Sequence, residues 1–249
     1  MPPHPQDEPN PGLDRVRHEL RATGIEPEVA NPLISGVHSR GFLPHVKREG
    51  ASYFVTFRLA DSLPKEVLLK FEAERAEQLR QCHRAKQQSR STSDSEEEIT
   101  RDFRRKVERY LDKGHGACHL HRPEVAELVA RAVQHFEGQR YLLSDWVVMP
   151  NHVHAVLSPM PNEVLSEILK SWKQFTSRRA KPMVGVRDEH FWQPESFDHW
   201  IRSDEEKARI CRYIWNNPVT ARLCQQPEDW QWSSAWPGWK NAAKTSPAS

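Results

Sequence analysis

The sequence predicts an α+β fold: a ferredoxin-like split βαβ arrangement with an antiparallel sheet covered on one face by helices, plus extra helices. Segments rich in β-branched and aromatic residues occur at 52–61 and 140–158, and amphipathic helical patterns separate them. The resulting order is strand, helices, strand, strand, helix, strand, helix. This order is typical of a split βαβ sheet, and no internal repeat interrupts it.

The first half of the chain predicts one strand and a helical region. Residues 1–40 are rich in proline and polar groups and are expected to form an irregular N-terminal arm. The segment "SYFVTFRLAD" at 52–61 predicts the first strand. A charge-rich helical pattern runs from Lys65 to about Gln87, where the polar stretch "QQSRSTSDSEEEIT" predicts a loop. Two further amphipathic helices are predicted at 100–114 and 122–138.

The second half predicts a hairpin, whose arms at 140–149 and 152–158 turn at "PN". An amphipathic helix follows, with Asn162 as its expected N-cap, and then a short strand in "FWQPESFDHWIRS". Ser203 is expected to cap the last long helix, and Pro218 predicts that this helix ends near Asn216. The tail holds four tryptophans, which are expected to fix it to the body by burial.

Composition narrows the class of protein. The 249 residues are 37% hydrophobic and 28% charged, which is typical of a soluble protein. No run of 18 apolar residues and no apolar leader is present, so a membrane role is not expected. A cytoplasmic, nucleoid-associated location is expected instead. The net charge of +2 does not by itself indicate nucleic acid. The four cysteines lack a C-x-x-C spacing, which favours reduced thiols.

Two histidines stand in the apolar segment "VVMPNHVHAVL". Side chains alternate along a strand, so His152 and His154 point to the same face and one metal ion can contact both. A histidine pair alone is more often structural, because two imidazoles can simply form hydrogen bonds in a core. A second group, His115, Cys118, His119 and His121, does not have the spacing of a zinc finger and favours a polar turn.

A second constellation lies on the last long helix. Tyr213 and Asn217 are four residues apart and therefore share a helix face. A tyrosine oxygen is a possible nucleophile, but with a pKa of about 10 it needs a nearby metal or cation. Arg209 and Arg212 are the candidate cations. The alternatives are that Tyr213 is a core residue and that Asn217 only caps the helix.

The helix after the hairpin carries one acid against six bases between 167 and 187, a pattern that fits contacts to a nucleic-acid backbone. Lys170, Lys173, Arg178 and Arg179 are the candidate DNA-binding residues here. Trp172 and Phe175 lie among them and are expected to belong to the core rather than to stack on bases.

Five stretches in succession resemble one family. They are "VVMPNHVH", "LKSWKQFTSRRAK", "FWQPESFDHWIRSDEE", "YIWNNPVTARL" and "DWQWSSA", and the resemblance as a whole covers roughly residues 40–236. The chain resembles the REP-associated tyrosine transposases, single-strand insertion-sequence transposases of the HUH endonuclease class. It departs from them at Arg222, which stands where a glycine is usual.

The resemblance implies a metal-dependent single-stranded DNA endonuclease and strand transferase. His152 and His154, with Asn217 as a third ligand, are expected to bind Mg²⁺ or Mn²⁺, and Tyr213 to form a 5′-phosphotyrosine. The implied partner is single-stranded DNA with hairpin-forming REP repeats, bound by a monomer or homodimer. The expected domain is 41–226, with an inserted region at about 72–122 and a tail at 227–249.

Two other functions fit the same residues. A domesticated protein could recognise DNA hairpins without cleaving or transposing them. A metal hydrolase could act on a small phosphate ester, and it would need a pocket rather than an open basic groove.

Overall fold

The computed structural model describes residues 36–40, 43–47, 50–87, 96–187 and 190–242. Its strands are β1 (Gly36–Arg40), β2 (Leu43–Lys47), β3 (Tyr53–Arg58), β4 (Tyr141–Val148), β5 (His152–Pro159) and β6 (Phe197–Trp200). Its helices are α2 (Lys65–Gln87), α3 (Glu96–Leu111), α4 (Pro123–Gln134), α5 (Leu165–Val184), α6 (Asp204–Thr220) and α7 (Pro237–Ala242), with short 3-10 turns η1 (His119–His121) and η2 (Pro227–Asp229).

The main sheet has the strand order β4-β5-β3-β6, and each neighbouring pair is antiparallel. Since β3 and β4 are both antiparallel to β5, they run parallel to each other with β5 between them. The connection from β3 to β4 includes α4, and α5 connects β5 to β6 across β3. The sheet is therefore built from two split βαβ units, which confirms the predicted fold class.

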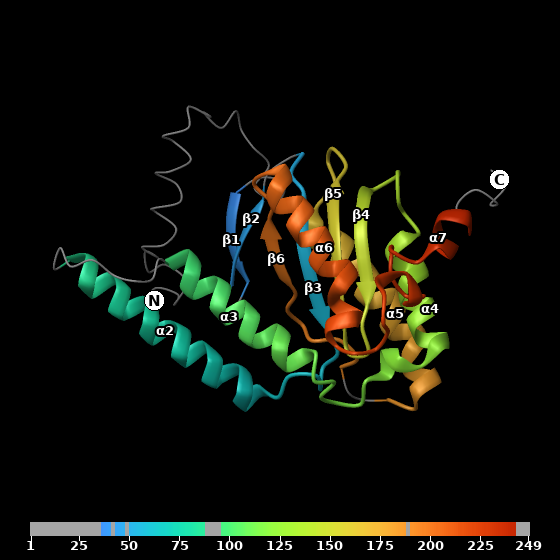
Figure 1. The fold of residues 1–249 in the computed structure, drawn as a ribbon, viewed down its shortest axis with the longest axis horizontal. Helices are drawn as coiled ribbons and strands as arrows, with labels where there is room; N and C mark the ends of the chain where they lie inside the picture. The colour runs from blue at the N-terminus through green and yellow to red at the C-terminus, as the bar shows by residue number, and fades with distance from the viewer. Residues whose placement is uncertain (1–35, 41–42, 48–49, 88–95, 188–189, 243–249) are drawn as a thin grey trace, which may run out of the picture.

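Helices cover both faces of this sheet, whereas cover on one face was expected (Figure 1). Val153, Ala155 and Leu157 of β5 belong to the core shared with α4 and α5. Val156 faces the other way, in a second core with Ile210 and Ile214 of α6. The prediction was wrong because β5 is apolar on both faces, and such a strand must be covered twice.

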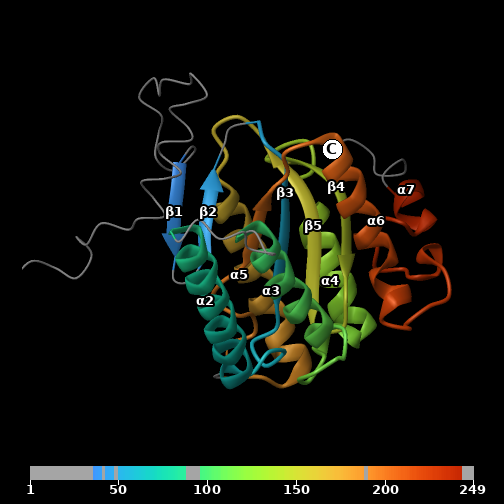
Figure 2. The ribbon, with the colours of Figure 1, turned by 60° about the vertical axis from the view of Figure 1, so that its left-hand side comes forward.

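The region between β3 and β4 forms a helical hairpin. Helix α2 has the predicted bounds, and α3 packs alongside it (Figure 2). Helix α3 begins at Glu96 rather than near Thr100, so the end of the predicted polar loop is helical. The rest of that loop, 88–95, lies outside the described residues. The helix predicted at 122–138 has Pro123 in its first turn, as expected.

Helix α5 begins later than predicted. Its N-cap is Val164, while Asn162 has a φ of 69° in the left-handed region, so Asn162 is a turn residue and not the cap. Helix α6 does begin as predicted, because the Ser203 side chain accepts a hydrogen bond from the backbone N–H of Glu206 at 3.1 Å.

Helix α6 continues through Pro218 to Thr220, so the predicted end near Asn216 is wrong. The steric rule disfavours helical geometry before proline but does not forbid it. Burial of Asn217 and Pro218, together with the hydrogen bond from Ala221 N–H to the Asn217 carbonyl at 2.9 Å, stabilises the last turn. Arg222 then takes a left-handed φ of 58°, a conformation that favours glycine.

The C-terminal tail pairs with the outer edge of β4. The backbone N–H of Val148 donates to the Trp232 carbonyl at 2.8 Å, and that of Ser234 donates to the Trp146 carbonyl at 2.9 Å. The Trp230 indole donates to the Val148 carbonyl at 3.0 Å. These contacts confirm that the tryptophan-rich tail is fixed to the body.

Residues 36–40, expected to be irregular, form β1, which pairs antiparallel with β2 in a separate two-stranded sheet. The remainder of the predicted arm, 1–35, lies outside the described residues. Among the described helices, none is both long and apolar enough to cross a membrane.

Candidate active site

The two histidines of β5 converge in the interior. His152 and His154 are both fully buried, and their Nε2 atoms lie 3.0 Å apart. In the register of β3 with β5, Arg58 is opposite His152 and Thr56 is opposite His154, so all four side chains lie on the α6 face of the sheet. The alternation of a strand thus places both imidazoles toward one point.

The other ring nitrogen of each histidine is held by a neighbour. The Asn151 amide nitrogen donates to the carbonyls of Leu111 and His115, which leaves its oxygen 2.7 Å from His152 Nδ1. An amide oxygen only accepts, so His152 Nδ1 carries the proton and Nε2 carries the lone pair. Thr56 Oγ1 lies 2.7 Å from His154 Nδ1 and can either donate or accept.

Both imidazoles are neutral at physiological pH. Burial, followed by the nearby Arg58 guanidinium, lowers the pKa of His152 to about 3. Burial, followed by His152, lowers the pKa of His154 well below its ordinary value. The Phe54 ring stacks on His154 with centroids 5.3 Å apart. Neutral imidazole is the form that binds metals.

Helix α6 brings Tyr213 and Asn217 to the same place. The Tyr213 hydroxyl lies 3.3 Å from His154 Nε2, and the Asn217 amide nitrogen donates to that hydroxyl at 3.0 Å. Asn217 is buried in the last turn of the helix, whose C-cap is Ala221, so Asn217 does not cap the terminus. Its Oδ1 is buried and has no hydrogen-bond partner within the described residues.

Helix α3 adds charged groups that sequence reasoning missed. The Glu108 carboxyl lies close to the Tyr213 hydroxyl, and burial raises the pKa of Glu108 to about 7. Burial also raises the pKa of Asp112 to about 6. Burial and these two carboxyls raise the pKa of Tyr213 well above 10. The available signal was the spacing of Arg104, Glu108 and Asp112 on one helix face.

The predicted cations of α6 lie at the surface. Arg212 is exposed beside Tyr213. The Arg209 guanidinium is 71% exposed and lies 3.6 Å from the Glu206 carboxylate. Their role in DNA binding stays a prediction.

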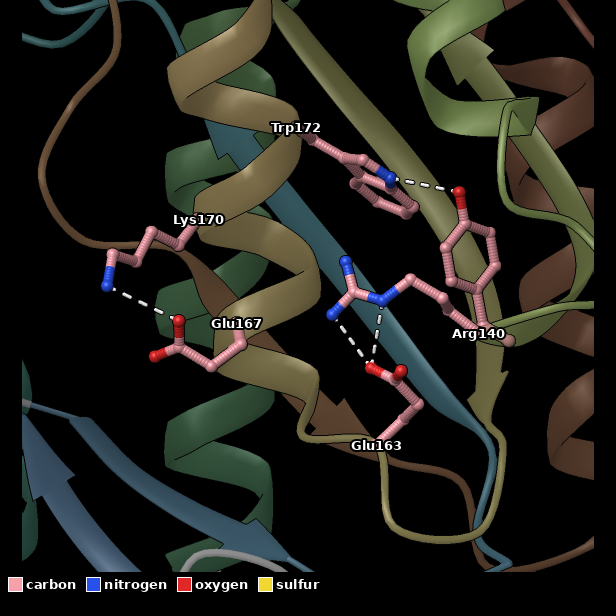
Figure 3. A network of polar contacts seen from close by, with 6 residues as sticks. Arg140, Glu163, Glu167, Lys170 and Trp172 are labelled. Carbon is pink, nitrogen blue, oxygen red and sulfur yellow. Dashed lines mark hydrogen bonds and ion pairs between the residues drawn. The ribbon is translucent and has the colours of Figure 1, made fainter.

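The predicted cations of α5 lie on the opposite side of the sheet from the histidines, because α5 packs on the Val153 and Ala155 face. Lys170 is exposed and pairs with Glu167 on the same helix, while Arg140 pairs with Glu163 nearby (Figure 3). The structure therefore separates this set from Tyr213. Arg178 and Arg179 are exposed.

Lys173 is different from its neighbours, because it is half-buried against the loop before β6. Its amine donates to the Pro194 carbonyl at 2.9 Å and to Ser196 Oγ at 3.0 Å. Burial, followed by Arg58, lowers the pKa of Lys173 to about 8. Of the two aromatic residues on α5, Trp172 is in the core as predicted, whereas Phe175 is 45% exposed and was wrongly predicted.

The described residues test which groups fit a metal ion. No cluster of three or more His, Cys, Asp or Glu side chains with metal-site geometry occurs in the described part, so His115, Cys118, His119 and His121 form no such site. The 3-10 turn η1 contains His119 and His121, and Cys118 is its N-cap. Beside His152 and His154, the unpartnered buried oxygen of Asn217 is an atom that fits a third ligand.

Residues 119–217 match the family model described as Transposase IS200 like. A Haemophilus influenzae protein that carries the name REP-associated tyrosine transposase is 26% identical over 100 residues, which are 35% of this chain and 54% of that protein. The chain thus spans about half the length of the curated relative that it matches.

Two solved structures are also similar. One, of a REP-associated tyrosine transposase bound to a REP hairpin, has a TM-score of 0.43 and 17% identity, over 84% of this chain and 87% of that one. The other, from Deinococcus radiodurans and named as a transposase, has a TM-score of 0.28 and 15% identity, over 72% of this chain and 96% of that one. At these TM-scores the fold assignment rests on the strand order alone.

Proposed function

We propose that this chain, whose residues 119–217 match the IS200-like transposase family model, is a metal-dependent endonuclease and strand transferase for single-stranded DNA. One observation carries the proposal. The Tyr213 hydroxyl lies 3.3 Å from His154 Nε2, which in turn lies 3.0 Å from His152 Nε2. The proposed nucleophile and the two nitrogens proposed to bind metal therefore lie close together.

The ligands in this proposal are His152 Nε2, His154 Nε2 and Asn217 Oδ1. A divalent ion bound there supplies Lewis acidity, which stabilises the charge that develops on a phosphate. Mn²⁺ suits two imidazoles and an amide oxygen at least as well as Mg²⁺, which prefers oxygen ligands. Asn151 and Thr56 orient the two rings, as outer partners of metal-bound histidines usually do.

The proposed reaction is a transfer and not a hydrolysis. Tyr213 Oη attacks the scissile phosphorus, the bond from phosphorus to O3′ breaks, and the leaving strand keeps a 3′-hydroxyl after taking up a proton. The Glu108 carboxyl, which lies close to the tyrosine, is the group placed to receive the Tyr213 proton. The product is a 5′-phosphotyrosine, whose bond energy allows a second 3′-hydroxyl to reverse the step.

The proposed substrate is a single strand next to a hairpin-forming repeat. The support is the name of the Haemophilus influenzae relative, which associates that protein with REP sequences. Exposed Arg209 and Arg212 on α6 lie nearest to Tyr213 among the predicted DNA-binding cations. Lys170, Arg178 and Arg179 are proposed to contact a more distant part of the strand, since α5 lies on the other face.

The test uses labelled single-stranded hairpin DNA, drawn from repeats near the gene, with Mn²⁺. Wild-type protein is expected to give a covalent adduct that survives denaturation, and Tyr213→Phe none. Tyr110→Phe, on the α3 helix, is the matched control and should retain the adduct. His152→Ala should abolish the adduct while leaving the hairpin affinity within a few fold.

Two results would reject the proposal. If no palindromic strand gives an adduct, but the hairpin binds equally well with and without metal, the chain is a hairpin-binding protein without cleavage. If small phosphate esters are hydrolysed and single-stranded DNA does not compete, it is a metal hydrolase.

A further inference from the structure

A small cavity lies beside the candidate active site, between α3 and the strands β3 and β6. Its volume is about 60 Å³, and its walls include Thr56, Arg58, Arg104, Glu108 and Phe197. Because a cavity of roughly 150 Å³ is needed to enclose a benzene ring, this one is too small to enclose a nucleobase. It has room for a few water molecules or one oxyanion.

Two arginines that line this cavity have unpaired donors. The Nε atoms of Arg58 and Arg104 are buried and have no hydrogen-bond partner within the described residues. The Arg104 guanidinium lies over the Phe197 ring, 4.4 Å from its centroid, which fixes its plane. A buried donor without a partner is costly, so two of them in one cavity indicate a ligand that accepts hydrogen bonds.

Both arginines lie close to the reacting groups. Arg58 is the register partner of His152, and its charge contributes to the lowered pKa of that histidine. Arg104 is near enough to Tyr213 for the two to interact electrostatically. Thr56, in the wall between them, contacts His154. An anion in the cavity would therefore lie next to the scissile phosphate and not on it.

Acidic groups also face the cavity, namely Glu72, Glu108 and Glu195. Within the described residues none of them forms an ion pair with either arginine at contact distance, and burial raises the pKa of both Glu72 and Glu108. The two guanidiniums remain charged at any physiological pH and so determine the preference for an anion.

We propose that Arg58 and Arg104 form a binding site for a non-scissile phosphate of the DNA strand, one that adjoins the phosphate attacked by Tyr213. The inference rests on the proposed function, since the phosphate belongs to that substrate. It assigns the α2–α3 hairpin a role in substrate positioning: Arg104 on α3 completes a site that β3 alone cannot form. A phosphate held there fixes the register of the strand over Tyr213.

The test measures binding of the full-length protein to a hairpin strand in EDTA, where cleavage stops. Methylphosphonate, which lacks the negative charge, replaces one phosphate at a time. In wild type, methylphosphonate at one non-scissile position should weaken binding about tenfold, as expected for the loss of a charge-assisted contact. Arg104→Gln should bind the unmodified strand about tenfold more weakly than wild type does. Methylphosphonate at the sensitive position should not weaken the binding of this variant any further. Arg105→Gln, an exposed neighbour on α3 that pairs with Asp102, should keep the wild-type profile.

The outcomes separate the two proposals. The same strand is incubated with Mn²⁺ to detect the Tyr213 adduct. If the adduct forms but wild type has no sensitive non-scissile position, or if Arg104→Gln keeps that sensitivity, the phosphate site is wrong and the function stands. If the strand neither binds nor forms an adduct, both fail. The wild-type scan decides the question even where Arg104→Gln does not fold.

Discussion

Replacing the Glu108 carboxyl by an amide tests the electrostatics of the interior beside Tyr213. Glu108 is partly buried on α3, close to the Tyr213 hydroxyl, and burial raises its pKa from an ordinary 4.5 to about 7. Glu108→Gln keeps the shape and the capacity for hydrogen bonds but removes the titration. The variant therefore isolates the cost of ionising this site.

The direction in which stability changes with pH follows from proton binding in the folded and unfolded states. As pH rises from about 4.5 to about 7, the unfolded chain releases the Glu108 proton while the folded protein keeps it, so the free energy of unfolding falls. The difference between the folded and unfolded pKa of Glu108 corresponds to a change of about 3 kcal/mol in the free energy of unfolding, at about 1.36 kcal/mol per pKa unit. The glutamine variant should match wild type near pH 4.5 and be more stable by up to about 3 kcal/mol at pH 8.5.

The assay is urea unfolding, followed by tryptophan fluorescence, at several pH values in EDTA. Glu127→Gln on α4, where the carboxylate is exposed and pairs with Arg131, serves as the control and should change stability by less than about 0.5 kcal/mol at every pH. Parallel stability curves for wild type and Glu108→Gln would refute the reasoning. Asp112 keeps its own raised pKa, so some pH dependence should persist in the variant.

Three further changes test single contacts. Thr56→Val removes the hydroxyl that holds His154 Nδ1 and should lower Mn²⁺ affinity by about 10- to 100-fold in calorimetry. The control Ser52→Ala, which breaks the hydrogen bond between the Ser52 and Ser158 hydroxyls, should leave Mn²⁺ affinity unchanged. Equal Mn²⁺ affinities of Thr56→Val and wild type would contradict His154 as a ligand. Arg222→Gly relieves a left-handed backbone and should raise the free energy of unfolding by about 1 kcal/mol, so a loss would count against that strain. Ser203→Ala removes the N-cap of α6 and should cost about 1 kcal/mol in thermal unfolding, and an unchanged melting temperature would show the cap to be dispensable.

The fold could be predicted because its strands have a strong local signal. The β-branched and aromatic residues of β3 and the "PN" turn before His152 specify a strand and a hairpin without any tertiary information. Helix ends were less predictable. Pro218 was expected to stop α6, but burial of the last turn in the core outweighs a local steric preference.

The site could be predicted only in part. The spacing of His152 and His154 indicates a shared face, and helical spacing places Tyr213 with Asn217, yet the contact between the two groups depends on how α6 packs on the sheet. Glu108 was missed because a glutamate in a charge-rich helix is usually exposed. Its burial follows from the docking of α3 over β3 and β6, which no local pattern encodes.

Pairing of the tail with β4 has a consequence for solubility. Without residues 232–234, the backbone groups of Trp146 and Val148 would be left as an open edge on a strand that is apolar on both faces. Open edges of this kind pair with other chains and promote aggregation. The tryptophan-rich tail therefore acts as a built-in cover of the sheet, and shortening the chain before Trp230 should favour self-association over simple unfolding.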